Sequence, residues 1–253
     1  MRRAEGVVER ISDMNSAIKK EISQFNRLAS TWWDNEGPMW PLHRLNALRV
    51  PFILRHARRH FDCSSSADFS ALRFLDIGCG AGILSESIAR TGASVVGIDA
   101  ADRNIDIARQ HGAAEGLDIA YFNTTIESFE SDELFDVVLN MEVVEHVADP
   151  QRFLKDCARR VRPGGLMFVA TINRTVYSAI TAIFGAEYVL GWLPKGTHQW
   201  GQFVTPEETR VALQSDDFSV IEQTGVAVNP LTKSMALNAF LGGNYMLVAE
   251  RRA

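Results

Sequence analysis

The sequence has few cysteines, and their positions suggest neither a disulfide framework nor a metal cluster. Its 253 residues include only three, at positions 63, 79 and 157, without a CxxC pair or another metal-binding spacing. Cytosolic proteins keep such thiols reduced, so we expect a cytoplasmic protein. The first 20 residues lack the apolar core of a secretory signal, and three acids among them are untypical of a transit peptide. We therefore expect no import signal.

The chain also lacks an excess of positive charge and a long apolar run. Its formal net charge is −5, which argues against broad attraction to nucleic-acid phosphates, so we expect no nucleic-acid partner. No stretch reaches 18 uninterrupted apolar residues, and a membrane-spanning helix is not expected. The hydrophobic share of 46% and the charged share of 23% are typical of a folded globular protein. The length favours one large domain with additions.

Strand-like and helical runs alternate through most of the chain after a polar connector at 62–70. Strands separated by single helices imply right-handed crossovers and a parallel sheet with helices on both faces. The sequence thus predicts a doubly wound α/β fold. The expected strands are 73–77, 94–99, 119–123, 135–140, 166–171, 218–228 and 244–251, and the expected helices are 82–91, 103–115, 150–161 and 206–214, the last capped by Thr205 and Glu208.

Two helices are predicted before the regular alternation, a polar one at 16–30 and another at 42–61. We therefore divide the chain into an N-terminal helical arm, 1–70, packed on the core, and a main domain, 71–253. The main domain is interrupted at about 175–203 by an inserted apolar segment.

Three glycines mark the first strand-to-helix turn as a ligand site. Gly78, Gly80 and Gly82 follow a strand directly and open a helix, where backbone must turn sharply and approach a ligand closely. Asp99 ends the next strand, where an acid binds the ribose hydroxyls of a nucleoside. Asp76, at the tip of the first strand, is placed to meet a cationic amino group. The alternatives are that Asp76 only caps loop amides and that Asp99 only serves a helix N-terminus.

A dinucleotide cofactor competes with a single nucleoside at this turn. Its fingerprint is GxGxxG, but position 83 is Ile and the third glycine is Gly82. The turn also lacks the lysine and hydroxyl ending of a phosphate-binding P-loop. The spacing disfavours an NAD-dependent oxidoreductase, which stays as an alternative, and favours S-adenosylmethionine.

Several motifs together carry a family resemblance. The turn LDIGCGAG, the acid in GIDA, the run FDVVLNMEVVEHV and the RPGG before the fifth strand resemble class I methyltransferases. The resemblance implies a seven-stranded, mostly parallel sheet of order 3-2-1-4-5-7-6, with the seventh strand antiparallel. Trp-Trp-Asp at 32–34, PLHRLN at 41–46, GAEY at 185–188 and PKGTH at 194–198 resemble the ubiquinone-biosynthesis O-methyltransferase family more narrowly.

This resemblance implies methylation of phenolic hydroxyls on two polyprenylated intermediates, 2-polyprenyl-6-hydroxyphenol and 3-demethylubiquinol. Other ubiquinone-biosynthesis proteins are its implied partners. By position, the cofactor contacts fall on Arg49, Gly78, Asp99 and Met141, and ligands for Mg²⁺ fall on Glu142, Glu145 and His146.

The chemistry of a phenol leaves the role of the acidic cluster open. A phenol has an ordinary pKa near ~10 and must lose its proton to become a good nucleophile. Glu142, Glu145 and His146 follow the fourth strand, at the sheet edge where ligands bind in such folds. They could hold a divalent ion that a catechol chelates. Alternatively, Glu145 or His146 is the catalytic base, or all three merely belong to a surface turn.

The inserted segment is the most apolar stretch of the chain. Residues 177–193 include four aromatic residues and are followed by Lys195, as in helices that lie in a membrane interface. We predict peripheral association with the inner face of the cytoplasmic membrane, against an internal lid as the alternative. Methylation of another lipophilic phenol, and a non-catalytic scaffold of quinone synthesis, stay as further alternatives.

Overall fold

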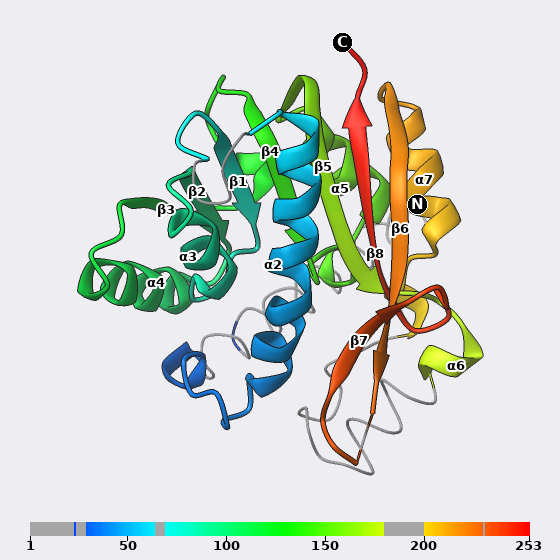
Figure 1. Cartoon of the computed structure of the whole chain (residues 1–253), viewed down its shortest axis with the longest axis horizontal. Helices are drawn as coiled ribbons and strands as arrows, with labels where there is room; N and C mark the ends of the chain where they lie inside the picture. The colour runs from blue at the N-terminus through cyan, green and yellow to red at the C-terminus, as the bar shows by residue number, and fades with distance from the viewer. Residues whose placement is uncertain (1–22, 24–28, 64–68, 180–199, 230) are drawn as a thin grey trace, which may run out of the picture.

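The computed structural model describes residues 23, 29–63, 69–179, 200–229 and 231–253. Their strands form one eight-stranded sheet of order β3-β2-β1-β4-β5-β8-β6-β7 (Figure 1). The strands are β1 Arg73–Ile77, β2 Ser94–Asp99, β3 Ile119–Asn123, β4 Phe135–Met141, β5 Val161–Ile172, β6 Phe218–Val228, β7 Met235–Asn238 and β8 Asn244–Arg251.

The predicted doubly wound fold is confirmed, but the expected count of seven strands is wrong. Strands β1 to β5 pair in parallel, and β8 lies antiparallel between β5 and β6, as the family order implied. The additional strand β7 pairs with β6 at the edge of the sheet. It has only four residues, and each of them is half-buried or exposed. The sequence there has no alternating apolar pattern that would predict a strand.

Helices cover both faces of this sheet and explain why its central strands are almost wholly apolar. Successive residues of β5 point to opposite faces: Met167 packs with α5 (Pro150–Ala158) and α7 (Pro206–Gln214). Phe168 packs with α2 (Trp40–His60) and α3 (Ile83–Ala89) on the other face. The helix α4 (Asp102–Ala114) packs on β2 and β3. Strands covered on both faces are expected to read as continuous hydrophobic runs.

The N-terminal arm reaches the core through α2. Its buried side chains Phe52, Ile53 and Ala57 join the apolar cluster on one face of the sheet. The ring of Phe52 meets Phe168 of β5 edge-on, at 6.0 Å between centroids. Helix α2 thereby covers one face of the sheet, in front of β4 and β5 (Figure 1). The predicted boundary at residue 70 stays a prediction.

Two predicted helix ends are wrong. The polar helix expected at 16–30 lies mostly outside the described residues, and Ala29–Thr31 forms a 3-10 helix instead. The helix expected at 150–161 ends at Ala158, because Val161 already pairs with Phe135 in the sheet. Tertiary pairing of β5 thus overrides the local helical pattern.

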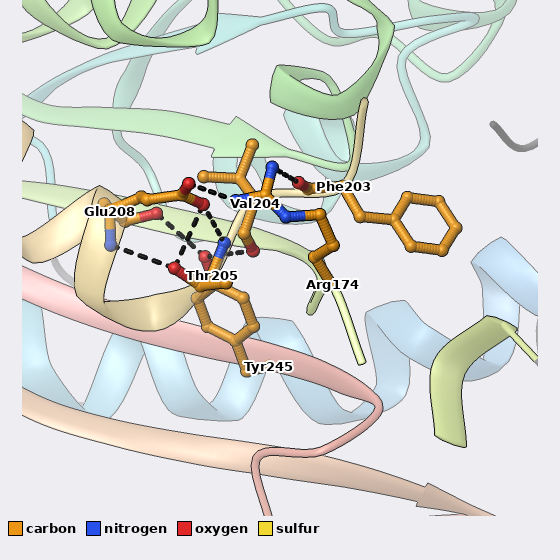
Figure 2. A network of polar contacts seen from close by, with 7 residues as sticks. Arg174, Phe203, Val204, Thr205, Glu208 and Tyr245 are labelled. Carbon is orange, nitrogen blue, oxygen red and sulfur yellow. Dashed lines mark hydrogen bonds and ion pairs between the residues drawn. The ribbon is translucent and has the colours of Figure 1, made fainter. Parts of the chain in front are cut away.

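A polar network joins the two described ends of the apolar insertion to the core (Figure 2). Arg174, which follows β5, pairs with Glu208 of α7 and donates to the carbonyl of Phe203 at 3.2 Å. Thr205 and Glu208 form the predicted capping box of α7. Tyr245 of β8 donates to the carbonyl of Val204 at 3.1 Å. The chain before and after the insertion is therefore held beside one end of the sheet.

The predicted interfacial helix at 177–193 falls mostly outside the described residues, which include only its first three positions. Tyr177 and Ser178 belong to a short helix, α6 (Val176–Ser178), which is capped by Thr175 at its start and ends before Ala179. Within the described ranges, no helix is both long enough and apolar enough to cross a membrane.

Candidate active site

The glycine turn after β1 is held against the end of β2 by its own backbone. The N–H groups of Gly78 and Cys79 both donate to the carbonyl of Ile98, at 2.8 and 3.0 Å. Gly78, Gly80 and Gly82 all have positive φ, at 70°, 56° and 87°. Only glycine adopts this left-handed region without strain, so the three positions require it.

Aromatic side chains of the N-terminal arm cover this turn. A Cβ added at Gly80 would lie 2.3 Å from the ring of Trp32. The indole of Trp33 donates to the carbonyl of Ala81 at 3.1 Å and stacks on His111 of α4, with ring centroids 3.5 Å apart. The arm therefore shapes the outer wall of the turn.

Asp99 connects the turn to the following helix. Its carboxylate accepts from the N–H of Gly80 at 2.9 Å and from the N–H of Ala101 at 2.7 Å. Burial raises the pKa of Asp99, and these two amides oppose that rise. The alternative role at a helix N-terminus is thus partly realised, since Ala101 immediately precedes α4. Asp99 also lies at the carboxyl end of β2, the position at which the sequence predicts a contact with the ribose hydroxyls.

Asp76 is a buried acid at the end of β1. Its carboxylate accepts a hydrogen bond from the hydroxyl of Ser85 at 2.6 Å. Burial raises the pKa of Asp76 to about 7, against the opposing effects of Ser85 and of the Arg49 charge. A buried acid of this kind gains most when a cation arrives beside it.

Buried Arg49 and half-buried Glu142 form an ion pair at the same edge. Helix α2 supplies Arg49, whose Nη2 lies 2.5 Å from Glu142 Oε1. Asn244, the first residue of β8, donates through Nδ2 to both carboxylate oxygens at 2.9 Å. Glu142 therefore already has hydrogen-bond donors on both of its oxygens.

Glu145 lies in the 3-10 turn Val144–His146 that follows β4. It is buried and accepts a hydrogen bond from the hydroxyl of Thr171 at 2.7 Å. Burial, with the nearby charge of Glu142 as a smaller cause, raises the pKa of Glu145 to about 7. The adjacent His146 is half-buried. A carboxyl with a pKa near neutrality has the acidity expected of a general base at neutral pH.

The three predicted metal ligands do not fit a metal site as they lie here. In the described part of the chain, no group of three His, Cys, Asp or Glu side chains is placed to hold a metal ion. Glu142 is taken by Arg49 and Asn244, and Glu145 by Thr171. The assignment of Mg²⁺ to Glu142, Glu145 and His146 stays a prediction that this geometry does not support.

The predicted cofactor residues lie at one edge, where the parallel strands end. Met141 is the last residue of β4, and a Cβ added at Gly78 would meet Val143, two residues further on. Gly82 lies somewhat apart, beside Tyr121 of β3. Sequence reasoning missed the side chains that hold these residues, which are Ser85, Thr171, Asn244 and Trp32. The one sequence signal for Asn244 was the expected antiparallel last strand. Because that strand runs against the others, its first residue lies at the edge where the parallel strands end.

The fold and this edge define a methyltransferase of the doubly wound class. A family model described as a methyltransferase domain matches residues 42–223. An enzyme of Parvibaculum lavamentivorans named ubiquinone biosynthesis O-methyltransferase is 50% identical over 234 residues, which cover 91% of this chain and 92% of the relative. A Methylobacterium nodulans protein of the same name is 50% identical, with 93% and 96% covered. The chain belongs to the family of ubiquinone biosynthesis O-methyltransferases.

Solved structures support the same fold. The magnesium protoporphyrin IX methyltransferase of Synechocystis, solved with bound S-adenosylhomocysteine, superposes with a TM-score of 0.64 at 15% identity. The alignment covers 90% of this chain and 94% of that one. The family relationship favours methyl transfer over the alternative of an NAD-dependent oxidoreductase.

Substitution of Gly80 tests how closely the arm covers the turn. Gly116 is the matched control, because its φ is also positive, at 68°, but nothing lies within 4 Å of an added Cβ. We expect Gly116→Ala to lower the free energy of unfolding by about 1 kcal/mol through φ alone. Gly80→Ala is expected to cost at least about 1 kcal/mol more, because the methyl group meets Trp32. Urea denaturation measures both, and equal losses would contradict the contact.

Asp76→Asn tests the buried acid through the pH dependence of stability. The pKa of Asp76 is about 7 in the folded protein and ordinary when unfolded, so the folded state holds the proton more tightly. Wild-type stability should therefore fall as pH rises from 4 to 7, by up to about 4 kcal/mol, and the Asn variant should escape this loss. Denaturation at pH 5 and pH 8 measures it, and a constant difference between the two proteins would refute the raised pKa.

Proposed function

We propose that this chain transfers a methyl group from S-adenosylmethionine to phenolic hydroxyls of polyprenylated intermediates, 2-polyprenyl-6-hydroxyphenol and 3-demethylubiquinol. The observation that carries the proposal is that the glycine turn packs on the segment after β4 that carries Glu145, because a Cβ added at Gly78 would meet Val143. Glu145 is buried there, and burial raises its pKa to about 7. Family membership supports the choice of acceptor, because the named relatives act in ubiquinone biosynthesis.

The cofactor residues divide by charge. Asp99 at the end of β2 is assigned to the ribose hydroxyls, and the glycine turn allows close approach of the nucleoside. Asp76 is assigned to the amino group and Arg49 to the carboxylate of the methionine part, since opposite charges are attracted most strongly where water is excluded. Met141 is assigned to the wall beside them. The bound cofactor supplies an electrophilic methyl group on a sulfonium.

Proton removal from the phenol falls to Glu145 and His146. Glu145 accepts a hydrogen bond from Thr171, and its pKa of about 7 is close to the neutral pH at which a general base works best. His146 is the more accessible of the two. We assign the base to this pair. The remaining catalysis comes from placing the phenol oxygen in line with the methyl group. No step is assigned to a metal, because Glu142 and Glu145 have other partners.

The test is production of S-adenosylhomocysteine from a short-tailed demethylubiquinol, with chelator and with Mg²⁺. We expect wild-type turnover in both, and Glu145→Gln and His146→Asn should lower kcat by about 100-fold or more because general-base catalysis contributes that much. Affinity for S-adenosylhomocysteine should stay unchanged in both variants. Full activity of both variants in chelator would rule out the pair as the base.

We also propose peripheral membrane binding around the apolar insertion. Val176, Tyr177 and Trp200 belong to its two described ends and are exposed, and Phe240 meets Tyr177 edge-on at 5.2 Å between ring centroids. Trp200 donates to the carbonyl of Thr175, so the exposed side chains at the two described ends of the insertion lie close together. Aromatic side chains of this kind favour the bilayer interface. A polyprenyl tail resides in the bilayer, so the enzyme must meet it there.

Flotation with phosphatidylethanolamine and phosphatidylglycerol vesicles tests this surface. The double variant Val176→Glu, Trp200→Glu should lose most vesicle binding, because two charges would enter the interface. Val211→Glu, at an exposed position on α7, is the control and should bind like the wild type. Equal flotation of all three proteins would overturn the membrane proposal.

A further inference from the structure

The structure assigns Glu142 and Asn244 as positioning residues that hold Arg49 for the carboxylate in the amino-acid part of the cofactor. The inference rests on the proposed function and deepens it. It also gives Glu142 a different role from the metal ligation that the family resemblance implies.

The first support comes from the hydrogen bonds that the guanidinium of Arg49 makes and the one that it lacks. Arg49 gives one guanidinium nitrogen to Glu142, and its side chain is 4% exposed. Its Nε has no hydrogen-bond partner among the described residues, so a buried donor is left over. Buried donors are rarely left unpaired, and a ligand acceptor would satisfy this one. A carboxylate matches a guanidinium because it accepts hydrogen bonds through two oxygens.

Asn244 fixes the carboxylate from the other side. Its Nδ2 reaches both oxygens of Glu142 at 2.9 Å. A monodentate ion pair alone would let Glu142 rotate, whereas a donor shared between the two oxygens fixes the carboxylate plane. The cluster joins three elements that are distant in the sequence, namely α2, the end of β4 and the start of β8.

The backbone of Glu142 supports a built arrangement. Its φ is 60°, in the left-handed region that a non-glycine residue rarely adopts, and its N–H donates to the carbonyl of Ala170 at 2.8 Å. Such strained conformations persist where the surroundings hold them, and they concentrate at functional sites. The turn directs the Glu142 side chain to Arg49 directly after β4 ends.

Charge complementarity identifies the ligand group. Asp76 lies close enough for the Arg49 charge to affect it, so one edge of the site carries a cation and an anion that are both buried. An amino acid carries the matching pair, an ammonium and a carboxylate. A metal ion bound to Glu142 would instead have to displace Arg49 and stay beside that cation.

Two ligands separate the amino-acid contact from the nucleoside contact. S-adenosylhomocysteine has the amino-acid part, and 5′-methylthioadenosine has the same nucleoside without it. Calorimetry in chelator should show that Glu142→Gln and Asn244→Ala weaken S-adenosylhomocysteine binding about ten-fold or more. Both variants should bind 5′-methylthioadenosine within about two-fold of the wild type. Glu133→Gln breaks a surface pair with Arg73 and should change neither affinity.

Each other outcome overturns the inference. If Glu142→Gln binds S-adenosylhomocysteine like the wild type in chelator but loses the stimulation of its turnover by Mg²⁺, that result would restore Glu142 as a metal ligand. Equal loss of both ligands would show a general structural role. If the wild type binds neither ligand, the proposed function fails together with the inference. If it binds both and the variants bind like it, the inference alone fails.

Discussion

The ion pair between buried Arg49 and half-buried Glu142 is the interaction on which the rest of the site depends. Arg49 belongs to the N-terminal arm, and Glu142 directly follows the central strand β4. Removing Glu142 would leave the buried guanidinium of Arg49 without its counter-charge, which destabilises a folded protein. The arm therefore cannot leave the sheet without exposing the cofactor edge. The contact of Trp32 with Gly80 works in the same direction, because it places an arm residue directly on the glycine turn.

Several acids at this edge have raised pKa values, so their environment favours the protonated carboxyl. Burial raises the pKa of Asp76, Asp99 and Glu145, although each accepts at least one hydrogen bond. Keeping such groups buried costs stability, which is the usual consequence of shaping a site for ligands. In the assigned roles, the buried acids that lower stability are the groups that act on the ligands. Asp76 would gain a cation when the cofactor binds, and Glu145 would accept a proton from the acceptor phenol.

Strand positions were largely predictable, and the partners of the site residues were not. Strands 73–77, 94–99 and 119–123 match their predicted bounds, because apolar runs bounded by turns leave little choice of register. The edge strand β7 was missed because it is short and exposed. The glycine turn, Asp76 and Asp99 were predicted at the sheet edge. Asn244 and Thr171 escaped, since their hydrogen bonds to Glu142 and Glu145 join residues 102 and 26 positions apart.

The sequence by itself determined the fold class, the location of the site and the family. Periodicity, glycine spacing and residue type are local properties, and each depends on a few neighbouring positions. The tertiary structure alone decided what the charged residues do there. From the sequence, Glu142 was either a metal ligand or an acid of a surface turn, until α2 and β8 placed Arg49 and Asn244 on its oxygens. Function of a buried carboxylate depends on which donors fill its hydrogen-bonding positions, and only the folded chain brings those donors together.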